Sequence, residues 1–93
     1  MKLVIHYNHL DRSDSFDHLI KSKSEKLLHK FRGEGSLIWN CTKEKKENIS
    51  HARLNLKGKI FNATTRAKDL YKTIEINLGK IEKQLEKGFQ YES

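Results

Sequence analysis

The sequence predicts an α+β fold with the element order β-α-β-β-β-α, a four-stranded mixed sheet with two helices packed on one face. Three observations predict it: helical periodicity over residues 69–87, a second helical segment near the N-terminus, and three alternating segments between them. Ninety-three residues suffice for one domain with a single core. We therefore expect residues 1–93 to form one domain.

Residues 69–87 form the longest periodic segment, and their apolar side chains recur at intervals of four and three, on one helical stripe. These are Leu70, Ile74, Leu78, Ile81 and Leu85, with Tyr71 at the edge. The charges are sorted by sign into a lysine quadrant and a neighbouring glutamate stripe. They are Lys72, Lys80, Lys83 and Lys87, and Glu75, Glu82 and Glu86. Because like charges at i,i+4 are mildly unfavourable, we expect an external partner for the lysines, although a merely solvated face stays open.

The first helix is predicted to begin at Ser13, whose hydroxyl can cap a free amide, with Asp14 and Asp17 at the positive end of the helix dipole. Its apolar side is interrupted by Ser24, and Gly33 and Gly35 are expected to end it. The apolar residues are Phe16, Leu19, Ile20, Leu27, Leu28 and Phe31. Lys23, Lys26 and Lys30 flank that side with the spacing of Lys80, Lys83 and Lys87.

The strands are predicted from alternation, with one face of the sheet apolar and the other polar and basic. The expected strands cover residues 2–7, 37–42, 50–56 and 60–67, with turns at 45–48 and 57–59. The first strand reaches the second through a helix, which predicts a right-handed crossover and parallel pairing, whereas the last three form an antiparallel meander. Trp39 and Phe61 fall on the apolar face and are predicted to lie in the core.

Nineteen lysine and arginine residues against twelve aspartate and glutamate residues give a formal net charge of +7. Residues 36–68 hold most of it, with eight basic and two acidic residues. This balance favours a polyanionic partner, either nucleic acid or an anionic membrane surface. No segment approaches the roughly 20 apolar residues of a membrane span, and the N-terminus is not a signal peptide. We expect a cytoplasmic protein, and the single cysteine, Cys41, agrees with a reducing compartment.

The sequence predicts no enzyme, no metal site, no cofactor and no small-molecule substrate. The histidines share no ligand spacing with Cys41, and there is no phosphate-cradling glycine loop or catalytic grouping of Ser, His and Asp. The histidines are His6, His9, His18, His29 and His51. With Trp39 and Phe61 in the core, no aromatic platform is left for stacking bases, so folded RNA contacted through its phosphates fits better.

The residues also resemble a known family, the ribosome hibernation promoting factors and the related ribosome-associated inhibitor, also called the sigma-54 modulation proteins. Its second helix reads close to DMYxAIDxxxxKLxRQLxK. The matching residues are Asp69, Leu70, Tyr71, Ile74, Lys80, Ile81, Lys83, Gln84, Leu85 and Lys87. Upstream, Ile5, Leu10 and Ser13 match an N-terminal motif, and Lys23, Lys26 and Leu27 match K-x-x-K-L in the first helix. The chain departs from the family at three positions. Tyr7 stands where the family usually has glycine, and Ala67 stands where it often has a helix-capping serine. Gly79 interrupts the second helix.

The resemblance implies a short-form translation inhibitor, a stress-response protein that binds rRNA of the small ribosomal subunit at the mRNA and tRNA channel and stores ribosomes in an inactive state. The resemblance also implies that the chain has no C-terminal dimerisation domain, and off the ribosome it is expected to be a monomer. The candidate RNA-binding residues are Lys23, Lys26, Lys30, Arg66, Lys68, Lys80, Lys83 and Lys87. We expect the two lysine triplets to merge into one basic ridge, with Arg66 and Lys68 helping. Two alternatives stay open: a generic double-stranded RNA-binding domain, and a protein-interaction regulator using the charged face of residues 69–87.

Overall fold

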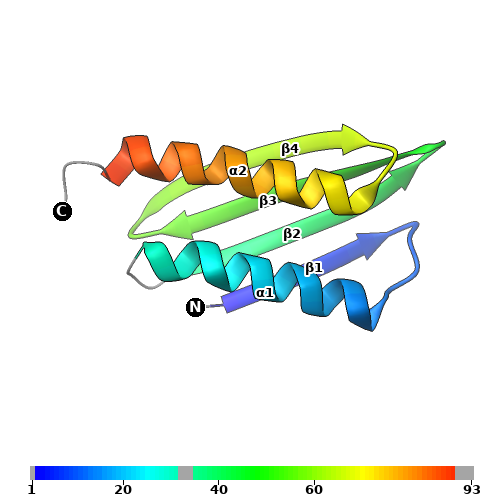
Figure 1. Cartoon of the computed structure of the whole chain (residues 1–93), viewed down its shortest axis with the longest axis horizontal. Helices are drawn as coiled ribbons and strands as arrows, with labels where there is room; N and C mark the ends of the chain where they lie inside the picture. The colour runs from blue at the N-terminus through cyan, green and yellow to red at the C-terminus, as the bar shows by residue number, and fades with distance from the viewer. Residues whose placement is uncertain (1, 32–34, 90–93) are drawn as a thin grey trace.

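The structure is a computed structural model that describes residues 2–31 and 35–89. The elements are β1 (Lys2–Asn8), α1 (Asp14–Lys30), β2 (Gly35–Glu44), β3 (Glu47–Leu56), β4 (Lys59–Ala67) and α2 (Leu70–Phe89). The strands form one sheet in the order β1-β2-β3-β4, with β1 parallel to β2 and the other neighbours antiparallel. Both helices lie across the same face of the sheet (Figure 1). The predicted fold class and topology are confirmed.

The core lies between the helices and the sheet, and Trp39 and Phe61 are part of it, as predicted. Trp39 is fully buried, and its indole Nε1 donates to Ser24 Oγ at 3.1 Å. Ser24 therefore does not weaken the packed side of α1. It is the acceptor that satisfies the buried indole N–H, which would otherwise be costly to remove from water.

The first helix begins as predicted and ends differently. Ser13 Oγ accepts from the Phe16 amide at 3.3 Å, which confirms the N-cap. The C-cap is Phe31, whose amide donates to the Leu28 carbonyl. The prediction that Gly35 ends this helix is wrong because Gly35 is the first residue of β2, and Gly33 lies outside the described residues. A Cβ at Gly35 would collide with the carbonyl oxygen of Asn55 on β3, so strand packing requires glycine there.

Two tight turns join the antiparallel strands. Lys57 and Gly58 have φ values of 53° and 80°, the left-handed conformation at both central positions that suits a two-residue hairpin. The β2–β3 turn is shorter than predicted, because Glu44 already pairs with Glu47. Residues 47 and 48 thus belong to β3, and only Lys45 and Lys46 form the turn.

The packed side of α2 is more polar than its apolar spacing indicates. Ile74, Ile81 and Leu85 are fully buried as predicted, but Thr73 and Asn77 are fully buried as well. The Asn77 amide nitrogen donates to the carbonyl oxygen of Ser50 at 2.9 Å and to Ser50 Oγ at 2.7 Å. Asn77 Oδ1 accepts from Thr65 Oγ1 at 2.5 Å. Asn77 therefore ties α2 to both β3 and β4.

Candidate nucleic-acid interface

A groove of about 400 Å³ runs between the two helices on the side of the molecule away from the sheet. Its walls carry the lysines of α1 on one side and glutamates of α2 on the other. It is lined by Lys23, Lys26, Leu27, Lys30, Glu75, Leu78, Gly79 and Glu82. We call Lys23, Lys26 and Lys30 the inner row, and Glu75 and Glu82 the glutamate row.

Two ion pairs cross this groove. Lys23 Nζ lies 3.1 Å from Glu75 Oε1, and Lys30 Nζ lies 3.2 Å from Glu82 Oε2. The hydrogen bond from Lys23 lowers the pKa of Glu75, with a further contribution from Tyr71. The Lys23 ammonium also sits 5.5 Å from the centroid of the Tyr71 ring, a cation–π contact. Two of the three inner-row charges are thus compensated within the protein.

Lys26 lies between these pairs in sequence and lines the same groove. It is exposed and makes no ion pair with any residue that the structure describes. Gly79 leaves open space where another residue would place a Cβ. Lys26 is therefore the member of the inner row whose charge remains available to a ligand.

The lysines of α2 lie on a different side of that helix. Lys80 Nζ donates to the Thr64 carbonyl oxygen at 2.9 Å and to Thr65 Oγ1 at 3.2 Å, along the outer edge of β4. These acceptors are neutral, so they position the ammonium group without cancelling its charge. Lys83 and Lys87 are exposed, and neither forms an ion pair within residues 2–31 and 35–89. We call Lys80, Lys83 and Lys87 the outer row.

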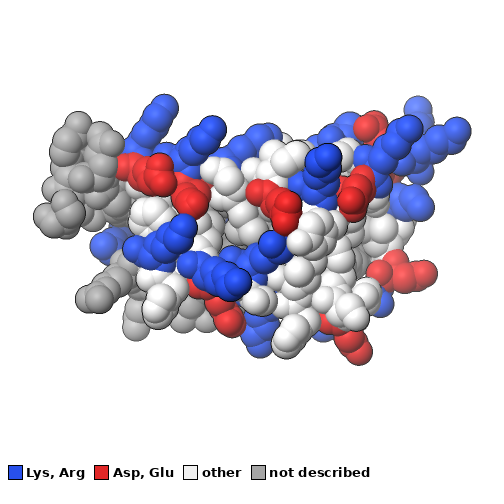
Figure 2. Space-filling view, in the orientation of Figure 1, with Lys and Arg blue, Asp and Glu red and all other residues white. Residues whose placement is uncertain are grey.

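The expected single ridge is not what the structure shows. The inner row faces the glutamate row, whereas Lys80 of the outer row is held against β4. Acidic side chains therefore lie between two lines of basic side chains on this face (Figure 2). The prediction that the triplets merge is wrong, because the rotation of α2 about its axis turns its glutamates toward α1.

Arg66 and Lys68 belong to the end of the molecule that holds the β2–β3 turn. Arg66 is on the sheet face away from the helices, 3.6 Å from Glu47 Oε1 and 3.9 Å from Glu44 Oε2. Lys68 is exposed, and its carbonyl oxygen accepts from the Asn48 side chain at 2.7 Å. Neither residue joins the inner row or the outer row.

The turn itself adds exposed charge that the candidate list omitted. The strand register places Lys43 opposite Asn48 and Asn48 opposite Ala67, beside Lys68, and Lys45 and Lys46 follow in the turn. Basic side chains gather at this end in Figure 2. The excess charge of residues 36–68 was the signal in the sequence that could have found them.

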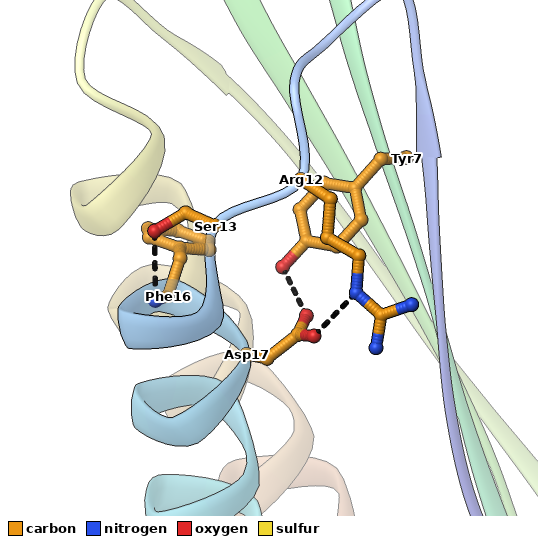
Figure 3. A network of polar contacts seen from close by, with 5 residues as sticks. All are labelled: Tyr7, Arg12, Ser13, Phe16 and Asp17. Carbon is orange, nitrogen blue, oxygen red and sulfur yellow. Dashed lines mark hydrogen bonds and ion pairs between the residues drawn. The ribbon is translucent and has the colours of Figure 1, made fainter.

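Tyr7 belongs to a polar network centred on Asp17, where β1 meets the start of α1 (Figure 3). Its hydroxyl donates to Asp17 Oδ1 at 2.6 Å, and Arg12 Nε lies 2.7 Å from Asp17 Oδ2. Burial, followed by the bond to Asp17, raises the pKa of Tyr7 well above its ordinary value. The hydrogen bond from Tyr7 lowers the pKa of Asp17. The network links two elements, and a phenol that holds its proton so firmly is a poor acid catalyst.

The cysteine and the candidate metal-ligating side chains of the described residues were the other groups that could have formed a reactive centre. Cys41 is fully buried, and burial raises the pKa of its thiol to about 11, so it stays protonated near neutral pH. The described part of the chain holds no group of three or more His, Cys, Asp or Glu side chains placed to bind a metal ion. Among the described helices, none is long and apolar enough to cross a membrane.

The family model for sigma 54 modulation protein / S30EA ribosomal protein matches residues 3–89. The chain belongs to this family. The resemblance predicted from the sequence is thus confirmed over nearly the whole chain. No curated protein sequence matches the chain.

Two solved structures resemble this S30EA domain. The N-terminal domain of Protein Y from Thermus thermophilus has a TM-score of 0.87 at 18% identity, covering 95% of this chain and 99% of that one. A ribosomal subunit interface protein from Coxiella burnetii has a TM-score of 0.78 at 27% identity, covering 95% and 97% respectively. The first likeness shows a shared fold, and the second extends it to a protein named for the ribosomal subunit interface.

At each of the three positions where this S30EA domain departs from the family pattern, the local structure accommodates the different residue. Tyr7 donates a hydrogen bond to Asp17, as described above. With alanine at position 67, Asp69 caps α2 instead, because its Oδ1 accepts from the Tyr71 amide at 3.0 Å. Gly79 lies within α2, which continues on both sides of it. The family fold therefore does not depend on the usual residues at these positions.

Proposed function

We propose that this protein binds the small ribosomal subunit through rRNA, occupies the channel used by mRNA and tRNA, and stores ribosomes in an inactive state. The observation that carries the proposal is the helical face, which presents the outer row and Lys26 with uncompensated charge on a chain of the S30EA family. The proposal includes the stress-response role that the family resemblance implies, and a ribosomal partner implies a cytoplasmic location.

The mode of binding we propose is contact with the phosphates of folded rRNA. Tyr7, Trp39 and Phe61 all lie on the helix-covered face of the sheet, so they offer no stacking platform to single-stranded bases. Lysine side chains on rigid helices instead suit recognition of RNA by the shape of its backbone. This mode needs neither a cofactor nor a small-molecule substrate, and a monomer suffices for it.

Within the binding surface, we assign the larger contribution to the outer row and Lys26. Lys23 and Lys30 contribute less because each must leave a glutamate to reach a phosphate. Lys68 extends the surface toward the β2–β3 turn, and Arg66 adds a smaller term because Glu44 and Glu47 lie beside it.

The proposal is tested by cosedimentation of the purified protein with small subunits. Lys83→Glu with Lys87→Glu reverses two outer-row charges, and Lys2→Glu with Arg53→Glu reverses two charges on the open sheet face. After circular dichroism confirms folding, the helix variant is expected to lose about tenfold or more in affinity, with the sheet variant close to wild type. Normal binding by the helix variant together with loss in the sheet variant would place the RNA-binding surface on the sheet.

Salt supplies a second readout on the same complex. Each phosphate neutralised should add about 0.7–0.9 to the slope of log affinity against log salt concentration. A slope near zero would indicate an apolar protein–protein contact instead. Equal affinity for naked duplex RNA would favour a generic double-stranded RNA-binding domain, and binding that survives nuclease digestion of the subunit would favour a protein partner.

A further inference from the structure

The glutamate row occupies the middle of the surface that the proposed function assigns to RNA. Glu75 and Glu82 come from α2, yet each is held by a lysine of α1, at 3.1 Å and 3.2 Å. Their side chains are 47% and 29% exposed, so both carboxylates remain open to a ligand that lies over the groove. A surface evolved only for maximal phosphate affinity would not place acids there.

These carboxylates affect different RNAs in different ways. A phosphate placed over the groove would draw Lys23 or Lys30 away from its partner and would lie close to the carboxylate left behind, which repels it. A hydroxyl or amino group placed over the groove would instead donate a hydrogen bond to the carboxylate. The glutamate row thus disfavours phosphates at this position and tolerates hydrogen-bond donors.

Double-stranded RNA meets this pattern. Its minor groove is wide and shallow and displays 2′-hydroxyl groups and base edges, with a phosphate backbone on either side. The outer row and Lys26 can contact phosphates while the groove between the helices faces hydroxyls. A flexible single strand has no fixed spacing of this kind, so its phosphates could enter the groove beside the inner row, where the glutamates oppose them.

We propose that Glu75 and Glu82 are specificity-determining residues, which keep single-stranded RNA away from the inner row and admit helical RNA presenting its minor groove. This inference rests on the proposed function, because it names the form of RNA that the same surface selects. In this proposal Lys23 and Lys30 bind phosphate only when their glutamate partners release them. Lys26 binds phosphate together with the outer row.

The test compares Glu75→Gln with Glu82→Gln against a control that changes net charge equally. Asp11→Asn with Glu25→Gln removes two exposed acids, neither of which makes an ion pair within the described residues. Affinities are measured for a short polyuridine strand and for small ribosomal subunits. The glutamate variant should gain roughly tenfold for polyuridine and steepen its salt slope by about 1.4, or 0.7 for each released lysine.

For small subunits, the affinity of the same variant should change by less than about threefold. In the control, the affinities for both ligands should change by the same small factor. Adding Lys23→Gln and Lys30→Gln to the glutamate variant should return polyuridine affinity to the wild-type value. That reversal would not occur if the substitutions acted through folding.

Two results overturn the inference: equal gains for both ligands, or equal gains from the glutamate variant and its control, since either would mean that only net charge matters. These failures are separate from failure of the proposed function. A wild-type protein that does not sediment with subunits refutes the function, whereas one that sediments while its selectivity ignores the glutamate row refutes only this inference.

Discussion

Replacing Asn77 with alanine should be among the most damaging polar substitutions in the chain. Asn77 is fully buried and takes part in three hydrogen bonds, two to Ser50 and one from Thr65. Each contributes about 1 kcal/mol net, and its loss strands a buried group, so we expect a cost of about 2–4 kcal/mol. For a domain of this size, that corresponds to a fall in melting temperature of roughly 10–30 °C.

The assay is thermal unfolding followed by circular dichroism, with Asn55→Ala as control. Asn55 is exposed on β3, so its replacement should cost less than about 0.5 kcal/mol. Removing the partners as well, by Asn77→Leu with Ser50→Ala and Thr65→Val, should recover a large part of the loss, because no side-chain hydroxyl is then left unpaired. Equal melting temperatures for Asn77→Ala and Asn55→Ala would refute the reasoning.

Two other predictions concern the packing of α2 and the network at the start of α1. Leu85→Ala should cost about 2–5 kcal/mol because the side chain is fully buried, whereas Lys83→Ala on the exposed side should cost under about 0.5 kcal/mol. Equal destabilisation in urea titrations would contradict the assignment of the helix faces. The hydrogen bond from Tyr7 lowers the pKa of Asp17 in the folded state. The ionised carboxylate therefore stabilises the fold above the ordinary Asp pKa of about 3.9, and this stabilisation is lost as pH falls through the lower pKa of the folded state. The stability difference between wild type and Asp17→Asn should therefore shrink from pH 7 to pH 3, and a difference that stays constant would count against the network.

Local hydrophobic patterns in the sequence were enough to predict most of the fold. Alternation placed Trp39 and Phe61 in the core, and the four-three spacing placed Ile74, Ile81 and Leu85 on the buried side of α2, because side-chain direction follows directly from backbone period. Burial of Asn77 could not be predicted in this way. It depends on acceptors and donors in β3 and β4 that meet α2 only after the chain has folded.

In the candidate site too, the sequence predicted the arrangement of side chains within each helix but not how the two helices face each other. Spacing correctly grouped the inner row on one side of α1, and it separated lysines from glutamates on α2. Which side of α2 turns toward α1 depends on how Thr73 and Asn77 seat the helix on the sheet, and their polar side chains gave no such indication. The expectation of a merged ridge rested on the matching spacing of the two lysine triplets alone.

The contacts of α2 with β4 also determine how copies of this protein can associate. Lys80 and Gln84 donate to the carbonyl oxygens of Thr64 and Asn62, which occupies acceptors that an added strand would need. At the opposite edge of the sheet, no side chain of the described residues donates to the backbone of β1. Among the described residues, the β1 edge is therefore the one left open to strand addition. Pairing through that edge would stop at two copies, because the β4 edges left outside in such a dimer have their acceptors occupied by Lys80 and Gln84.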